Sequence, residues 1–213
     1  MKKIYKLLAA GCLLLAVVSL SSCLSDSDNN NSDPEKEWKE WYEAVKAEVA
    51  ASHGPYAGYL YFQADATSEK VDSIAAEWDI ANDSLLVLRN VPTRLFVQKL
   101  PESQSSLKEA ISALNTVDVR VKIIYNVYYK SPLLFYVYPE PVTMNITVDG
   151  QPKTAVVNFM NFETANQSYG QVMVSDGRCA VNVFLENIVV DKSIIKTYSN
   201  YDYVYLNWFG RRR

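Results

Sequence analysis

The feature that most constrains the fold is an alternation of apolar and polar side chains with a period of two residues. It is clearest from residue 117 to residue 128, where apolar residues occupy the odd positions and charged residues most of the early even ones. Successive side chains of a β-strand point to opposite faces, so this segment is predicted to be a strand with one buried face. Similar short segments recur from residue 56 to residue 209, and turn pairs such as Asp149-Gly150 separate them.

About ten such segments predict a mainly β (α+β) fold, built as an antiparallel β-sandwich or as an open, barrel-like sheet. Two helices are expected beside the sheet. The first covers residues 34–51, where Pro34 suits the first helical position and apolar residues recur every three or four positions. The second covers residues 102–114. The segment 94–100 fits either a strand or a short helix.

The N-terminus reads as an export signal. Residues 1–22 contain three lysines near the start and then an apolar run that is too short to cross ~30 Å of hydrocarbon comfortably. The sequence Leu20-Ser21-Ser22-Cys23 resembles the lipobox of bacterial lipoproteins, in which the cysteine receives lipid and becomes the first residue. We therefore expect a lipid on Cys23 that attaches the mature protein to a membrane. A secretory signal that contains a cysteine by chance and a retained transmembrane anchor are the alternatives.

The composition of the rest of the chain limits its domain organisation and its possible partners. Residues 23–33 are rich in Asp, Asn and Ser and are predicted to form a flexible, acidic tether. Residues 34–213 contain no evident linker and are expected to form a single β-rich domain. Without residues 1–22 the chain has 18 basic and 24 acidic side chains, a net charge of −6, which argues against a nucleic-acid partner. The sequence leaves the oligomeric state open.

Few residues could carry chemistry. The chain has one histidine, His53, and, once Cys12 is removed with the signal and Cys23 is lipidated, one thiol, Cys179. A disulfide and a Cys/His zinc site cannot then be built, and phosphate-binding glycine motifs are absent from the sequence. We expect no metal, no cofactor and no enzymatic activity. A carboxylate-dependent hydrolase remains an alternative, because 24 acidic residues always offer some suitably spaced pair.

Aromatic residues are the more informative excess, with 15 tyrosines and 4 tryptophans. Their flat faces and hydrogen-bonding edges suit sugar or peptide binding, although aromatic residues also fill β cores. The candidate binding residues of the last strand are Tyr201, Tyr203, Tyr205 and Trp208. On helix 34–51, Trp38 and Trp41 either dock the helix on the domain or contact a partner protein.

Several short patterns point to one family. They are Gly58-Tyr59-Leu60, the stretch from Trp78 to Val87 with its Asn82-Asp83-Ser84 turn, Val91-Pro92, Ser131-Pro132 and the hairpin from Asn145 to Phe159. Together they resemble the lipoproteins of gut Bacteroidales that are grouped as the domain-of-unknown-function 4840 family. The resemblance covers most of residues 56–200. It implies a Bacteroidetes source and a cell-envelope location as an outer-membrane lipoprotein, and it supplies neither a catalytic residue nor a ligand.

Two further features resemble Bacteroidetes signals. Asp26 and Asp28 resemble the acidic signal that directs lipoproteins to the cell surface, although a plain linker fits these residues equally well. The sequences Asp72-Ser73-Ile74 and Asp83-Ser84-Leu85 resemble the acceptor motif of protein O-glycosylation. Ser73 and Ser84 are therefore candidate glycosylation sites.

The sequence thus predicts a non-enzymatic envelope lipoprotein that binds a glycan, a peptide or a partner protein through its β domain. The first alternative is an accessory subunit of an outer-membrane assembly that docks through helix 34–51. The second is the hydrolase. An exposed row of tyrosines on the last strand would favour direct binding. An exposed helix face with Trp38 and Trp41 would favour the accessory subunit, and a cleft with two facing carboxylates would favour the hydrolase. Whether the domain faces the surface or the periplasm is left open.

Overall fold

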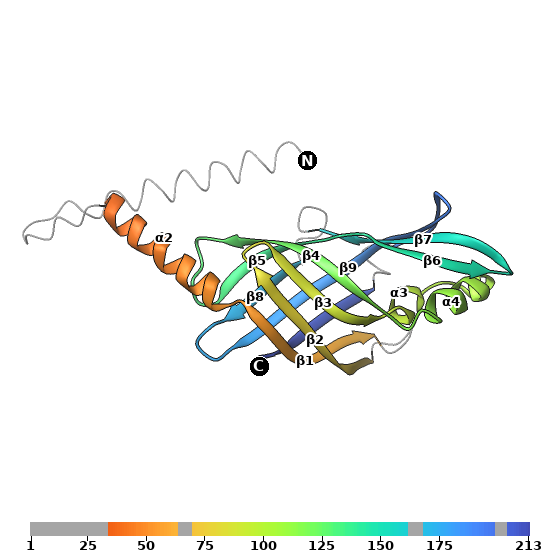
Figure 1. Cartoon of the computed structure of the whole chain (residues 1–213), viewed down its shortest axis with the longest axis horizontal. Helices are drawn as coiled ribbons and strands as arrows, with labels where there is room; N and C mark the ends of the chain where they lie inside the picture. The colour runs from red at the N-terminus through yellow and green to blue at the C-terminus, as the bar shows by residue number, and fades with distance from the viewer. Residues whose placement is uncertain (1–33, 64–69, 162–167, 199–203) are drawn as a thin grey trace, which may run out of the picture. The chain divides into compact units, whose positions relative to one another are not determined.

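The computed structural model describes residues 34–63, 70–161, 168–198 and 204–213 (Figure 1). The chain divides into two units, Met1–Trp38 and Lys39–Arg213, and the second unit holds every strand that the structure describes. All pairings between these strands are antiparallel. The mainly β class, the N-terminal helix and the internal helix predicted from the sequence are confirmed.

The elements follow one another along the chain with short connections. The helical segments are α2 (Pro34–Ala51), α3 (Arg94–Val97), the 3-10 turn η1 (Glu102–Gln104) and α4 (Ser105–Ser112). The strands are β1 (Gly54–Gln63), β2 (Val71–Asn82), β3 (Leu85–Pro92), β4 (Thr116–Asn126), β5 (Leu133–Pro139), β6 (Val142–Val148), β7 (Gln151–Met160), β8 (Tyr169–Met173), β9 (Arg178–Val190), β10 (Ser193–Thr197) and β11 (Tyr205–Arg212).

Eight of these strands close into a barrel. Their order is β11-β1-β2-β3-β4-β5-β8-β9, and β9 pairs back onto β11 to complete the ring (Figure 1). Of the two architectures expected from the sequence, the structure has the barrel-like one, and the barrel is closed. Closure removes the free sheet edges that an open sheet would expose.

Strand β9 is long enough to extend beyond the barrel within the same sheet. Its first half pairs with β8 and β11 in the barrel, and its second half pairs with β7 and β10. The β6–β7 hairpin extends this second region, and helices α3 and α4 lie beside it (Figure 1). Phe96 of α3 packs edge-to-face on Phe159 at 5.8 Å between ring centroids, and its carbonyl accepts a 2.9 Å hydrogen bond from the Tyr198 hydroxyl. The helices therefore bury the apolar face of the extension.

The last turn of α2 joins the helix to the barrel interior. Val49 is buried in the core, and the Ser52 hydroxyl donates to its carbonyl oxygen at 2.7 Å. The hydroxyl groups of Ser52 and Tyr125 lie 2.8 Å apart, and the Tyr56 hydroxyl donates to the Ser52 carbonyl oxygen at 2.7 Å. The Tyr56 ring stacks on Trp78 with an interplanar angle of 8°. These contacts satisfy the polar atoms of tyrosines whose rings fill the core.

Local differences from the sequence prediction have simple causes. The predicted helix 102–114 is a 3-10 turn followed by α4, and it ends before Asn115, whose φ of 63° is left-handed. The ambiguous segment 94–100 contains the short helix α3. The Asp149-Gly150 turn is as expected for a tight hairpin, with left-handed φ values of 51° and 77° between paired Val148 and Gln151.

Candidate functional site

The predicted tyrosine row on the last strand does not form one face together with Trp208. Tyr201 and Tyr203 lie outside the described residues. Tyr205 is half-buried, and its hydroxyl donates to Asn182 Oδ1 at 2.8 Å. Trp208 lies on the opposite face of β11 and is only 1% exposed. The alternation of a strand explains this, because positions 205 and 208 differ by an odd number of residues.

Aromatic side chains are exposed instead around α2 and the β4–β5 loop. Trp38 and Trp41 are 48% and 38% exposed. The Trp41 indole N–H donates to the Val127 carbonyl oxygen at 3.1 Å, which ties the helix to the loop. The next loop residues, Tyr128 and Tyr129, are 74% and 51% exposed. We call Trp41, Tyr128 and Tyr129 the aromatic surface.

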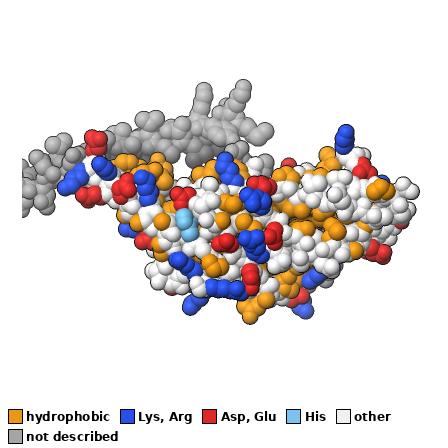
Figure 2. Space-filling model, in the orientation of Figure 1, with side chains coloured by type: hydrophobic (Ala, Val, Ile, Leu, Met, Phe, Trp, Pro, Cys, Tyr) orange, Lys and Arg blue, Asp and Glu red, His pale blue; other side chains and the backbone are white. Residues whose placement is uncertain are grey.

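Charges near the aromatic surface are mixed. The Lys130 ammonium lies 5.8 Å from the centroid of the Trp41 ring, close enough for a cation–π contact. On the helix, Lys46 pairs with Glu43 at 3.1 Å and lies 4.6 Å from the Tyr42 ring centroid. Figure 2 shows basic and acidic side chains interspersed over the face it draws. The aromatic surface therefore offers flat apolar area within a rim of both charge signs.

A second candidate site is an opening in the barrel wall between β2 and β3. Strand β2 pairs with β1 from Val71 to Ile80, but its pairing with β3 covers only Glu77 to Asn82. Strand β3 has a register shift between Leu88 and Val91, and Asn90 there has a left-handed φ of 50°. The first half of β2 and the last residues of β3 therefore diverge. A pocket of about 300 Å³ lies in this gap, and we call it the wall pocket.

The wall pocket reaches side chains of the core. Its apolar lining comes from β1, β2, β3 and β11 and includes Leu60, Ile74, Ala76, Val91 and Trp208. The Trp208 indole N–H is buried and has no hydrogen-bond partner among the described residues. A buried donor without a partner is costly, and burial keeps this nitrogen out of contact with solvent.

Ion pairs surround the mouth of the wall pocket. Arg89 donates to Asp118 at 2.8 Å, and Arg213 pairs with Glu77. The backbone N–H of Asn90 donates to Asp118 at 2.9 Å, and this bond together with Arg89 lowers the pKa of the Asp118 carboxyl. The guanidinium groups that line the pocket are thus already neutralised by carboxylates.

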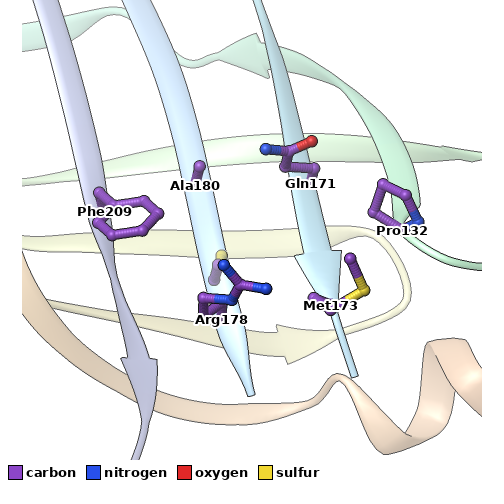
Figure 3. A pocket seen from close by; sticks show the side chains of 7 residues that line it. Pro132, Gln171, Met173, Arg178, Ala180 and Phe209 are labelled. Carbon is purple, nitrogen blue, oxygen red and sulfur yellow. The ribbon is translucent and has the colours of Figure 1, made fainter. Parts of the chain in front are cut away.

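A second hollow, of about 110 Å³, lies at the barrel wall by β8, β9 and β11 (Figure 3). Its labelled lining residues are Pro132, Gln171, Met173, Arg178, Ala180 and Phe209. The Arg178 guanidinium is held at 2.6 Å by Asp176, whose pKa is lowered mainly by the backbone N–H of Arg178. The hollow is too small to enclose a typical ligand.

Cys179 lies inside the barrel and is not poised as a nucleophile. The Trp78 indole N–H donates to its sulfur at 3.3 Å, and burial raises the pKa of the Cys179 thiol to about 12. His53 Nε2 lies 2.9 Å from a carboxylate oxygen of Asp83. Among the described residues, no group of three or more His, Cys, Asp or Glu side chains is arranged to hold a metal ion.

We expect the Cys179 thiol to be unreactive in the folded protein. A thiolate is the reactive form, so a buried thiol with a raised pKa should not react with an aromatic disulfide reagent at mildly alkaline pH. After denaturation about one thiol per chain should react. Rapid reaction of one thiol in the native mature protein would contradict the buried assignment.

The two candidate glycosylation sites are both exposed. Ser73 lies on β2, and Ser84 lies in the β2–β3 turn, where its N–H donates to Asn82 Oδ1 at 3.0 Å. Their modification remains a prediction.

The wall pocket is the site that sequence reasoning missed. Its residues come from four strands that only the barrel topology brings together. The one available signal was the interruption Asn90-Val91-Pro92 at the end of a strand, which marks where β3 turns away from β2.

Comparison with known proteins identifies the family of the chain. A family model described as a domain of unknown function (DUF4840) matches residues 51–190. No curated protein and no solved structure matches the chain. The matched range runs from the end of α2 to the end of β9 and includes β2 and β3 on either side of the wall pocket.

Proposed function

Because the chain belongs to the family described as domain of unknown function 4840, we propose its function from its own residues. We propose that it is a cell-envelope lipoprotein, anchored through Cys23, and that its barrel is a non-enzymatic domain that docks on a partner protein of the envelope. The aromatic surface is the docking element. Of the hypotheses drawn from the sequence, this is the accessory-subunit hypothesis.

The observation that carries the proposal is the exposure of Trp41, Tyr128 and Tyr129 on adjoining elements. Tryptophan and tyrosine are the side chains most enriched at the energetic centres of protein interfaces. The hydrogen bond from Trp41 to Val127 holds helix and loop together, so the surface is formed before a partner arrives. No helix among the described residues has the length and hydropathy of a membrane span.

The docking proposal predicts that Tyr128→Ala combined with Tyr129→Ala disrupts partner binding. Both residues lie in a loop, so the fold should be retained while recovery of the partner falls about tenfold or more. The measurement is co-purification of the lipidated protein from mildly solubilised membranes, with mass spectrometry and stoichiometry of the recovered proteins. Thermal unfolding of the variant should match that of the native chain.

The matched control is Tyr59→Ala, because Tyr59 is 54% exposed on β1 and lies outside the aromatic surface. This variant should recover the partner at the native level. If the native protein purifies alone, or if the double variant keeps a stoichiometric partner, the docking proposal fails.

A further inference from the structure

We propose that the outer face of the barrel wall formed by β1, β11, β9 and β8 binds a neutral oligosaccharide. Aromatic rings on this face stack on the sugar rings, and amide side chains bond the sugar hydroxyl groups. The face is distinct from the aromatic surface, so this inference does not rest on the membrane anchor or on the docking proposal.

The strand register defines two neighbouring rows of side chains on this face. They are Tyr59, Phe209, Ala180 and Gln171 in one row and Tyr61, Asn207 and Asn182 in the next. Their neighbours along the strands, such as Leu60, Val181 and Trp208, are buried, so the alternation of each strand directs both rows outward. Neither row contains a Lys, Arg, Asp or Glu side chain. We call these residues the uncharged band.

The rings of the uncharged band are open to solvent. Tyr59 and Phe209 are 54% and 44% exposed, and they lie opposite one another on β1 and β11. The centroid of the Tyr61 ring lies 6.3 Å from that of Tyr59, and the two rings are inclined at 52°. These adjacent rings offer apolar faces that the C–H groups of a sugar ring can cover.

Amide groups lie beside the rings and are held in place. Asn182 Oδ1 accepts hydrogen bonds from the Tyr205 hydroxyl at 2.8 Å and from the Asn207 amide. Gln171 is exposed at the end of the other row. An amide both donates and accepts, as a sugar hydroxyl does. Because neighbouring strands lie only ~4.8 Å apart, a ring and an amide can contact the same sugar.

The uncharged band has a recess at Ala180. Figure 3 shows Phe209 and Gln171 on either side of this small residue, where the hollow of about 110 Å³ lies. The hollow cannot enclose a whole ligand. It accepts one substituent, such as a hydroxymethyl group, of a ligand that lies across the wall.

The absence of charge from the band selects a neutral ligand. Charged residues begin in the next row, where Arg211 lies opposite Arg178, and Asp176 holds the Arg178 guanidinium at 2.6 Å. An ionic group placed on the band would lose water without gaining a counter-charge. A sugar hydroxyl loses water and gains an amide partner instead.

The topology argues against an extended peptide as the ligand. Each of β1, β11, β9 and β8 is paired on both sides, so this wall has no free strand edge to which a peptide could add. Recognition must come from side chains alone. Flat rings next to amides fit the C–H faces and the hydroxyl edges of sugars.

The test titrates the purified mature protein with neutral hexasaccharides by isothermal titration calorimetry. The probes are cellohexaose, maltohexaose, xylohexaose, mannohexaose and N-acetylated chitohexaose. At least one should bind with a dissociation constant below about 1 mM. Its affinity should change less than about twofold between about 0.05 and 0.5 M salt, because no charges are paired. The anionic hexagalacturonate should bind about tenfold more weakly.

Variants locate the site. Tyr59→Ala and Phe209→Ala each remove an exposed ring and should weaken the best-bound hexasaccharide about five- to tenfold. Ala180→Leu fills the hollow and should act in the same direction. Gln171→Ala, at the exposed end of the band, serves if a ring variant misfolds, which thermal unfolding would reveal.

The proposal is overturned if no hexasaccharide binds, or if folded Tyr59→Ala and Phe209→Ala chains bind the sugar like the native chain. Equal or tighter binding of hexagalacturonate, or competition for the band by a proline-rich peptide, overturns it as well. The loop double variant of the docking test should bind the sugar normally and lose the partner protein, whereas Tyr59→Ala should do the reverse. The two proposals therefore fail independently.

Discussion

Replacing Cys23 with alanine is expected to abolish fatty-acid attachment completely. The residues Leu20-Ser21-Ser22-Cys23 resemble a lipobox, and in a lipobox the sulfur atom of the cysteine receives the lipid. Without that thiol the chain should also keep residues 1–22, because cleavage before residue 23 depends on the modified cysteine. The loss of fatty acid should be all-or-none, since the sequence predicts no second acylation site.

The measurement is metabolic labelling with an alkyne fatty acid, followed by intact mass of the purified chain. The sequence supplies two matched controls, Cys12→Ala in the apolar run of the signal and Cys179→Ala in the barrel. Both should incorporate label at the native level. Fatty-acid label that persists in the Cys23→Ala chain would contradict lipid attachment at Cys23. The same mass spectrum tests Ser73 and Ser84, because a mass equal to the lipidated chain alone excludes a glycan on either.

Gly58→Ala is expected to destabilise the barrel by about 3 kcal/mol or more. Gly58 on β1 lies in register with Gly210 on β11. A Cβ atom at Gly58 would lie 2.2 Å from the Phe209 carbonyl oxygen and 2.5 Å from Gly210 Cα. Both obstacles are backbone atoms, so no side-chain rotation relieves the clash, and the two strands must move apart.

Urea unfolding of the native and variant chains measures this loss. Gly210→Ala should cost a similar amount, because its Cβ would lie 2.2 Å from the Ala57 carbonyl oxygen on the same seam. The contrasting variant is Gly150→Ala, where nothing lies within 4 Å but φ is +77°. It should cost only about 1 kcal/mol of backbone strain. Equal losses at Gly58 and Gly150 would show that close strand approach does not determine the effect.

The local structure was accessible from the sequence because its causes are local. Alternation from Val117 to Asn126 produced β4, and the Asp149-Gly150 pair produced the β6–β7 hairpin. Barrel closure was not accessible, because it depends on β9 pairing with β11 and β11 with β1. No short-range pattern records which distant strands meet.

The candidate sites divide in the same way. Trp41 was found because helical spacing placed it on one face, although its bond to Val127 needed the fold. Tyr205 and Trp208 were grouped by their nearness in sequence, and the strand separates them onto opposite faces. The wall pocket needed both the bulge at Asn90 and the inward direction of Trp208, which no single segment specifies.

The pairing of β1 with β11 also determines when the barrel can close relative to synthesis of the chain. Leu60 can meet its partner Trp208 only after all the intervening residues have been synthesised. Closing so long a loop carries a large entropic cost, and folds with distant pairings form slowly. A barrel that needs β11 to complete its ring therefore cannot close before β11 has been synthesised. For a chain that is exported as proposed here, this delay keeps the polypeptide threadable through a translocation channel until the barrel can close on the far side.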